Sequence, residues 1–269
     1  MLRQKVRQYY LRRLLQLPPP AARPDGPAGA LVVAPHPDDE TLGCGGTILQ
    51  KTAAGDPVTI VFLTDGRTSH AHLLPVAELV AARRREAVAA AAALGVPEAN
   101  VHFFDFPDGR LAEFAAPASK KIAALLRNSQ PGELYVPHHA DPQLDHRAAN
   151  QIVWAALRQT ACRAAVFEYP VWLWYAWPWV SPPLRSRREF KLVAQNSITT
   201  RLGRQMTQDF NTAVNCRHVL TQKKTALQRH QTQMSQYRSI PGWQTLHDVA
   251  GGEWLAYFFT GVEIFQQFT

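Results

Sequence analysis

The stretch HPDDE, residues 36–40, places one histidine and three consecutive acids directly after a short apolar run. Three adjacent carboxylates repel one another when they are buried together, and a divalent cation is a simple way to keep them ionised. A neutral imidazole and a carboxylate, completed by a distant histidine, form a catalytic zinc shell with one position open for water. The His-x-x-Asp spacing lets His36 and Asp39 point to the same side of a turn, which favours this chemistry.

Asp38 lies beside this pair and is not needed as a ligand. In that place its carboxylate is suited to take a proton from water, which is the role of a general base. An alternative is that Asp38 or Asp39 only caps a helix that starts near Thr41. Capping requires one acid rather than three, and it does not explain His36. Glu40 is then expected to be a supporting residue.

A second polar stretch, VPHHADPQLDHRAANQ at residues 136–151, supplies candidates for the distant histidine. It contains His138, His139 and His146. A lone histidine is more often a satisfied core or surface residue, but His146 directly follows Asp145, whose carboxylate is suited to orient a neighbouring group. The pattern predicts a metal site and leaves open which histidine completes it.

The elements around these stretches alternate between short β-rich runs and helical patterns. The expected strands are residues 30–34, 58–63, 101–104, 133–136 and 164–169. The expected helices are residues 42–54, 76–94, 119–129 and 146–160, and residues 217–236 look helical as well. Nearly continuous apolar strands, each followed by a helix, predict an α/β fold with an open, mainly parallel, Rossmann-like sheet. Residues 254–268 are expected to add one or two C-terminal extension strands.

Parallel sheets of this kind place their sites beyond the carboxyl ends of the strands. HPDDE follows the first expected strand, and Thr64–Gly66 follows the second. The loop with Asp105 and Asp108 follows the third, and the histidine-rich stretch at 138–146 follows the fourth. Polar, metal-competent side chains are therefore expected to gather at one edge of the sheet.

The 269 residues are expected to form one domain over 29–269, preceded by a basic amphipathic helix and Pro-rich linker over 1–28. Residues 1–17 are predicted either to cover the domain surface or to contact a membrane surface or partner peripherally. An aromatic-rich insertion is expected near 170–200. Its segment 170–183 holds four of the seven tryptophans and fits an active-site lid or a patch covered by the first helix or by a second subunit of a homo-oligomer.

The formal net charge of +8 raises the hypothesis of nucleic-acid binding. The basic residues lie in local groups, however, and no known nucleic-acid motif accompanies them, so a solvated surface is the better interpretation. Cys44, Cys162 and Cys216 form no CxxC pair, which argues against a thiolate zinc site and for a reducing compartment. We expect a cytoplasmic protein, with any membrane contact being peripheral.

The run APHPDDETLGCGG, residues 34–46, resembles the first motif of the LmbE-like, or PIG-L, de-N-acetylase superfamily. Other motifs of that family follow in its order: LTDG at 63–66, R-x-x-E at 83–86, PDG at 107–109, DH at 145–146 and K-x-A-L-x-x-H-x-T-Q at 224–233. The resemblance covers roughly residues 30–265 and implies a zinc-dependent hydrolase that removes an N-acetyl group from an amino sugar or sugar-containing conjugate.

The resemblance also implies roles for particular residues. The zinc ligands would be His36, Asp39 and His146, and the general base would be Asp38. Substrate contacts are implied by the matching positions, which are Arg83, Asp108 and Asp141. For Arg83 the alternative is an ordinary helix face shared with Glu86.

Gln143 departs from the family pattern, because many relatives have a histidine there that is held by the aspartate equivalent to Asp145. A glutamine donates a neutral hydrogen bond but carries no transferable proton, so a general acid at that position is lost. Replacements are sought in His138, His139 or His230, or in zinc alone.

Two rival functions remain. A nucleotide or methyl-donor binder is disfavoured because the glycines at 43–46 lack the G-x-G-x-x-G register and neighbouring acids would repel a phosphate. A protein with the same fold that acts as a different amidase, or binds without catalysis, is the alternative to a deacetylase.

Overall fold

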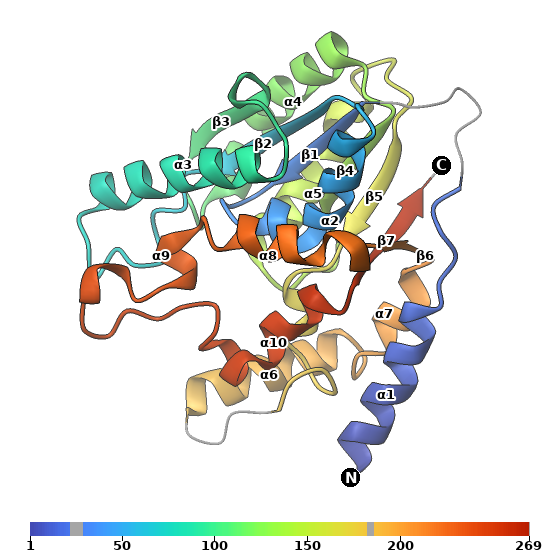
Figure 1. Ribbon diagram of the computed structural model, residues 1–269, viewed down its shortest axis with the longest axis vertical. Helices are drawn as coiled ribbons and strands as arrows, with labels where there is room; N and C mark the ends of the chain where they lie inside the picture. The colour runs from blue at the N-terminus through green and yellow to red at the C-terminus, as the bar shows by residue number, and fades with distance from the viewer. Residues whose placement is uncertain (22–28, 182–185, 269) are drawn as a thin grey trace.

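The structure is a computed structural model that describes residues 1–21, 29–181 and 186–268. At its centre lies a seven-stranded sheet in which the first five strands are parallel and β7 runs antiparallel to both of its neighbours (Figure 1). In spatial order the strands are β3 (Val101–Phe106), β2 (Val58–Thr64), β1 (Ala30–Ala34), β4 (Glu133–Pro137), β5 (Ala165–Tyr169), β7 (Val262–Phe268) and β6 (Thr212–Asn215). The predicted mainly parallel α/β sheet with C-terminal extension strands is confirmed.

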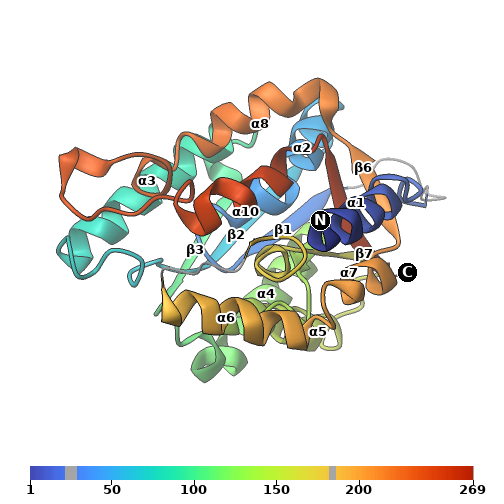
Figure 2. The same cartoon turned by 90° about the horizontal axis from the view of Figure 1, so that it is seen from below.

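Helices cover both faces of this sheet, which explains why its central strands read as continuous apolar runs (Figure 2). On one face lie α2 (Asp39–Ala53) and α3 (Val76–Ala93), and on the other lie α4 (Ala115–Ser129) and α5 (Leu144–Leu157). Alternate residues of β1 belong to two separate cores: Val32 packs with α2 and α3, and Leu31 with α4 and α5. Both faces of every central strand are therefore buried.

The N-terminal helix α1 (Leu2–Leu15) packs against the C-terminal part of the chain. Arg3 forms an ion pair with Glu253 at 2.8 Å, and the rings of Tyr10 and Trp179 have centroids 5.9 Å apart. Leu14 belongs to the core, whereas Leu2 is 72% exposed, so the expected apolar stripe is buried only toward its C-terminal end. The expected linker lies partly outside the described residues.

The aromatic stretch after β5 is largely buried. Trp174 stacks on Tyr257 with centroids 4.6 Å apart, and Trp179 is fully buried between this pair and α1. Trp172 lies at the edge of the cavity described below. The described part of the insertion thus contributes both to the core beneath α1 and to the wall of a cavity.

The C-terminal third contains elements that the sequence pattern did not indicate, namely α6 (Arg187–Thr199), α7 (Arg204–Asp209) and β6. The helix expected over 217–236 is divided at His230 into α8 (Leu220–Leu227) and α9 (Gln231–Met234). The segment expected as strand at 254–268 begins with α10 (Glu253–Ala256) and ends in β7. Short 3₁₀ helices lie at Glu98–Asn100, Leu111–Phe114, Trp172–Trp174, Arg217–Val219, Tyr237–Ser239, Val249–Gly252 and Tyr257–Phe259.

A buried ion pair fixes α2 to this C-terminal part. Lys223 of α8 donates to Glu263 of β7 at 2.7 Å and to the carbonyl of Leu42 at 2.8 Å. Glu263 also accepts the backbone N–H of Gly46 at 2.6 Å. The glycines of α2 allow this close approach, since a Cβ on Gly46 would lie 2.5 Å from Cys216 and 3.1 Å from Glu263 Oε1. These glycines serve helix packing at the start of α2.

Among the residues that the structure describes, no helix combines the length and apolar character that crossing a membrane requires.

Candidate metal centre

The polar residues that follow the parallel strands meet at one edge of the sheet. His36 and Asp38 lie between β1 and α2, Asp108 follows β3, and His146 lies in the first turn of α5 after β4. Because β1 is flanked by β2 and β4 in the centre of the sheet, the strand order brings these loops together.

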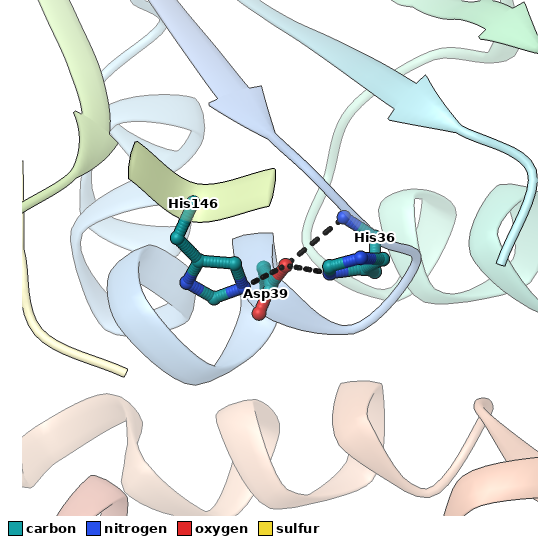
Figure 3. Close-up of side chains that lie close together, drawn as sticks. All are labelled: His36, Asp39 and His146. Carbon is teal, nitrogen blue, oxygen red and sulfur yellow. Dashed lines mark hydrogen bonds and ion pairs between the residues drawn. The ribbon is translucent and has the colours of Figure 1, made fainter. Parts of the chain in front are cut away.

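His36, Asp39 and His146 converge on a common point (Figure 3). Asp39 Oδ2 lies 3.1 Å from His36 Nδ1 and 3.3 Å from His146 Nε2. The backbone N–H of His36 also donates to Asp39 Oδ2, at 2.9 Å. Two imidazole nitrogens and one carboxylate are a donor set that suits a catalytic zinc ion and leaves a fourth position open.

The outer nitrogen of each imidazole faces another acid. His36 Nε2 lies 3.1 Å from Asp108 Oδ1 and 3.4 Å from Asp145 Oδ2, and His146 Nδ1 lies 3.4 Å from Asp141 Oδ1. Such carboxylates hold the proton on the outer nitrogen and leave the inner nitrogen free to bind a metal. The arrangement therefore fixes the tautomers that the proposed ligand set needs.

The charges of the cluster fit a cation. Burial lowers the pKa of His146, but the nearby carboxylates of Asp39 and Asp141 outweigh it and raise the pKa to about 9. For His36, burial acts in the same direction and is outweighed mainly by Asp108, so its pKa lies well above the usual value. Without a metal, the acids thus hold protons on both rings. His146 Nε2 is also buried without a well-aligned hydrogen bond, so the residues present fit a divalent cation at this point.

Asp38 occupies the N-cap of α2 in a conformation with φ of 128°, where non-glycine residues are uncommon. Its backbone N–H donates to Glu40 Oε2 at 2.9 Å, and the other oxygen of Glu40 lies 2.9 Å from His230 Nε2. Burial raises the pKa of Asp38 to about 7, although the guanidinium of Arg83, 3.4 Å away, acts to lower it. Asp38 is therefore held as a carboxyl with a pKa near neutrality at the cavity surface.

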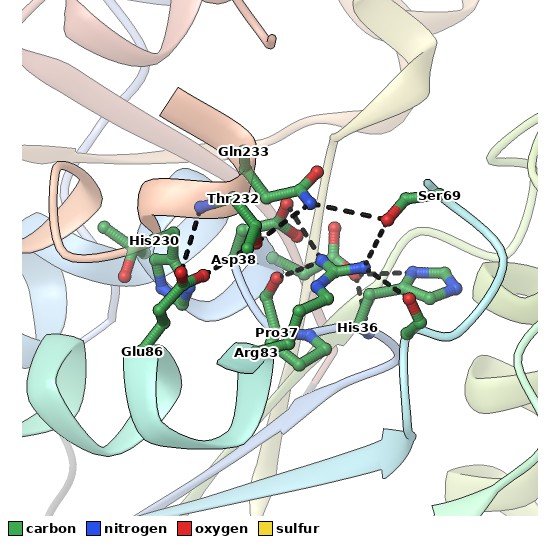
Figure 4. Close-up of polar contacts among 12 residues, drawn as sticks. His36, Pro37, Asp38, Ser69, Arg83, Glu86, His230, Thr232 and Gln233 are labelled. Carbon is green, nitrogen blue, oxygen red and sulfur yellow. Dashed lines mark hydrogen bonds and ion pairs between the residues drawn. The ribbon is translucent and has the colours of Figure 1, made fainter. Parts of the chain in front are cut away.

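Arg83 reaches the site from α3 and is almost fully buried. Its guanidinium donates to the carbonyl of Pro37 at 2.6 Å and to that of Gly66 at 3.0 Å (Figure 4). Gly66 has a positive φ of 65°, and a Cβ there would lie 2.5 Å from the guanidinium. Arg83 thus fastens the HPDDE turn to the loop after β2 while it lines the cavity.

Gln143 is the N-cap residue of α5. Its side-chain oxygen accepts the backbone N–H of His146 at 3.1 Å, and its side chain lines the cavity. With the oxygen used for capping, the amide NH₂ is left as a neutral hydrogen-bond donor. The residue that departs from the family pattern therefore still supplies a donor beside a candidate ligand.

These residues surround a cavity of about 210 Å³. Its lining also contains side chains that the sequence reasoning did not single out for the site. They are Leu42, Thr68, Ser69, Val171, Trp172, Gln233, Leu246 and Trp254. Gln233 lies in one of the recognised motifs, Thr68 donates to Asp108 at 2.7 Å, and Trp172 belongs to the aromatic segment that was expected as a lid or a covered patch. Nothing in the local pattern distinguishes Leu246.

Two residues expected near the reaction lie behind the cavity surface instead. Asp141 is fully buried and accepts the backbone N–H groups of Val171 and Trp172. His230 is buried beside Glu40, and the described cavity lining includes neither residue. Both lie where they support other residues, because Asp141 holds the backbone of Val171 and Trp172 and His230 Nε2 contacts Glu40.

His139 also lies away from the cavity, in a cluster with His138 and Glu168. One oxygen of Glu168 accepts from the backbone and the ring of His139, at 3.0 and 2.8 Å. The other accepts from Asn150 at 2.7 Å and Trp154 at 3.1 Å. Because both oxygens already accept two hydrogen bonds, this cluster is better described as an ion pair than as a metal site.

The part of the chain that holds the site is similar to known de-N-acetylases. Residues 31–157 match the family model described as PIG-L, GlcNAc-PI de-N-acetylase. Diacetylchitobiose deacetylase of Thermococcus kodakarensis is 35% identical over 126 residues, which cover 44% of this chain and 45% of that protein. A 1D-myo-inositol 2-acetamido-2-deoxy-α-D-glucopyranoside deacetylase of Salinispora arenicola is 38% identical over 76 residues, or 25% of each chain. The chain thus matches less than half the length of these curated relatives.

The similarity in fold to solved structures covers more of the chain than residues 31–157. The structure of N,N'-diacetylchitobiose deacetylase from Pyrococcus horikoshii superimposes with a TM-score of 0.63 and 19% identity, covering 98% of this chain and 92% of that one. At this identity the comparison shows a shared fold. The family match itself contains the strand-end residues described above, from the HPDDE turn to the first turn of α5. Residues 31–157 of this chain thus match the PIG-L family model, and the similarity of fold extends over the rest of the chain.

Proposed function

We propose that this protein is a zinc-dependent hydrolase that removes an N-acetyl group from an amino sugar or a sugar-containing conjugate. The observation that carries the proposal is the convergence of His36, Asp39 and His146 at a cavity that Asp38 also lines. The deacetylase names of the matched relatives support the substrate class, since both refer to acetylated amino sugars.

His36, Asp39 and His146 would hold the zinc ion. When bound, zinc supplies positive charge that acidifies water and polarises the acyl carbonyl. Asp108, Asp141 and Asp145 contribute by fixing the two imidazole rings from behind.

Asp38 acts as the general base in the proposed reaction. It accepts a proton from the attacking water as the water oxygen adds to the amide carbon. When the C–N bond breaks, Asp38 returns that proton to the amine nitrogen, so the products are a carboxylic acid and a free amine. Glu40 and His230 hold the backbone of Asp38 in place through the hydrogen bonds described above.

Gln143 stabilises the negative charge that develops on the carbonyl oxygen. Its amide N–H₂ is the neutral counterpart of a histidine at this position, and it provides a hydrogen bond without a transferable proton. Arg83 and Asp108 contact the sugar from the cavity wall, in addition to the contacts that they make within the protein.

The direct test is a panel of N-acetylated sugars and glycoconjugates, assayed for released free amine with metal-stripped and zinc-supplied protein. We expect amine release from at least one amino-sugar substrate, dependent on zinc. If amine release occurs only from amides without a sugar, the protein is a different amidase. If no substrate is hydrolysed and zinc does not bind, it is a binding protein that retains the fold.

We further propose a cytoplasmic location and a peripheral membrane contact through α1, whose outward side exposes Lys5, Tyr9, Arg12 and Arg13. Flotation with anionic vesicles should be reduced by charge-reversing changes at these arginines, and unchanged flotation would exclude the contact. Light scattering would measure whether the protein forms a homo-oligomer.

A further inference from the structure

The cavity beside the candidate metal centre has two chemically different walls. One wall is polar and carries the candidate base, ligands and hydrogen-bond donors. The other part of the lining, here called the aromatic wall, consists of the apolar side chains of Leu42, Val171, Trp172, Leu246 and Trp254. Zinc binding and amide hydrolysis require the polar wall, so the aromatic wall calls for a separate explanation.

Trp172 is the half-buried aromatic residue of this wall. Its indole stacks on that of Trp254 with centroids 4.7 Å apart and an interplanar angle of 21°. Trp254 is fully buried, and its Nε1–H donates to the carbonyl of Val171 at 3.1 Å. An ordered, rigid indole is thus presented at the cavity edge with a fixed tryptophan behind it.

The backbone of the wall is tied to the candidate metal centre through Asp141. Asp141 Oδ2 accepts the backbone N–H of Trp172 at 2.8 Å, and Oδ1 lies 3.4 Å from His146 Nδ1. One buried carboxylate therefore contacts both the imidazole that would bind metal and the backbone of the residue that carries the indole. A substrate that touches both would be oriented before the reaction begins.

A sugar ring matches these two walls, because it has hydroxyl groups around its edge and C–H groups on its faces. Flat indole surfaces bury such apolar faces well, while the polar wall is suited to hydrogen-bond the hydroxyls. The volume of about 210 Å³ lies below the range of roughly 300–1,000 Å³ for drug-sized ligands, which suits a single ring.

We infer that Trp172 is a specificity-determining residue whose indole packs on the C–H face of the sugar ring that carries the N-acetyl group. The inference rests on the proposed function and adds to it the residue that distinguishes a cyclic sugar from an acyclic amide.

The test compares Trp172→Ala, Trp172→Leu and Trp172→Phe with wild-type protein, all loaded with zinc. Each is assayed on an N-acetylglucosamine substrate and on N-acetylethanolamine, an acetamide without a ring. We expect Trp172→Ala to raise KM for the sugar about tenfold, which corresponds to about 1.4 kcal/mol, with kcat little changed. The kcat/KM for the acyclic amide should be unchanged. Trp172→Phe should retain most of the sugar affinity, and Trp172→Leu should behave like the alanine variant.

Trp174→Phe is the matched control, because Trp174 lies in the same 3₁₀ turn but not in the cavity lining. Calorimetric titration of the sugar in an Asp38→Asn background gives a readout that is independent of turnover. Parallel losses on both substrates would mean that Trp172 only supports the fold, and an unchanged KM in the leucine and alanine variants would also overturn the inference. If wild-type protein hydrolyses no N-acetylated sugar or glycoconjugate of the panel described above, the proposed function itself fails.

Discussion

Replacing Asp38 by asparagine separates catalysis from metal binding and folding. Asparagine has nearly the same shape, and like aspartate it tolerates positive φ better than most residues, which the φ of 128° at this position requires. The backbone N–H at position 38 keeps its hydrogen bond to Glu40. The substitution therefore removes the carboxylate while leaving the HPDDE turn intact.

The expected loss of activity follows from the role of a general base. Such groups contribute roughly 10²–10⁴-fold to the rate, or about 3–5 kcal/mol of transition-state stabilisation. Folding should not suffer in the same way. Burial raises the pKa of Asp38 to about 7, which means that the folded state favours the neutral form of this side chain. A neutral amide should therefore preserve the Tm of the metal-free protein or raise it.

The assay measures kcat, zinc content and Tm for wild-type protein, Asp38→Asn and a control, Asp56→Asn. Asp56 lies beyond the far end of α2 and contacts Lys51 at 3.8 Å, so it should affect none of the three quantities strongly. The base assignment is refuted if Asp38→Asn retains kcat within a factor of about ten with full zinc occupancy. A loss of zinc together with activity would instead make Asp38 a ligand.

Three further predictions concern other parts of the molecule. Gln143→Ala should lower kcat about 10–100-fold, because a hydrogen bond to the developing oxyanion is lost, and an unchanged kcat would exclude that role. Lys223→Met should lower the free energy of unfolding in urea by about 3 kcal/mol, because it leaves a buried carboxylate without its cation; Lys224→Met, an exposed neighbour, should change it little. His139→Gln should reduce stability by less than about 1 kcal/mol, since the side chain is half exposed. The hydrogen bond to Glu168 raises the pKa of His139, so the difference should be present near pH 6 and disappear as pH rises through that raised pKa, and a constant difference would contradict the ion pair.

The core of the fold could be predicted from the sequence because its signals are local. Strands such as β1 are continuous apolar runs between turn residues, and each is followed by a helical pattern of ordinary length. The elements α6, α7 and β6 were not predicted, because their apolar residues are few. In α6 only Val193 is a fully buried apolar residue, whereas Phe190 and Ile198 are exposed, so periodicity gives little guidance.

Some residues of the candidate site could likewise be predicted from the sequence, and others could not. His36 and Asp39 are close in sequence, and the spacing of the turn is enough to bring them together. His146 could be placed because the strand order of an open α/β sheet brings its loop to the same edge. Trp172 and Leu246 come from irregular segments whose positions depend on tertiary contacts, such as the backbone hydrogen bonds to Asp141.

The roles of second-layer residues depend on distances that no sequence pattern gives. The motif that contains His230 suggested a residue near the chemistry, but its imidazole is directed to Glu40. Asp141 was expected to contact substrate, yet its two oxygens face His146 and the backbone of Trp172. In both cases the short polar motif predicts that the side chain lies near the site, but it does not predict which group the side chain contacts.

The most direct test of the proposed metal centre is the zinc content of purified wild-type protein and of His146→Ala, measured by elemental analysis alongside amine release. We predict about one zinc ion per wild-type chain, loss of zinc and activity in His146→Ala, and recovery of activity when zinc is returned to metal-stripped wild-type protein. Full zinc occupancy in His146→Ala, or undiminished turnover by metal-stripped wild-type protein, would contradict it.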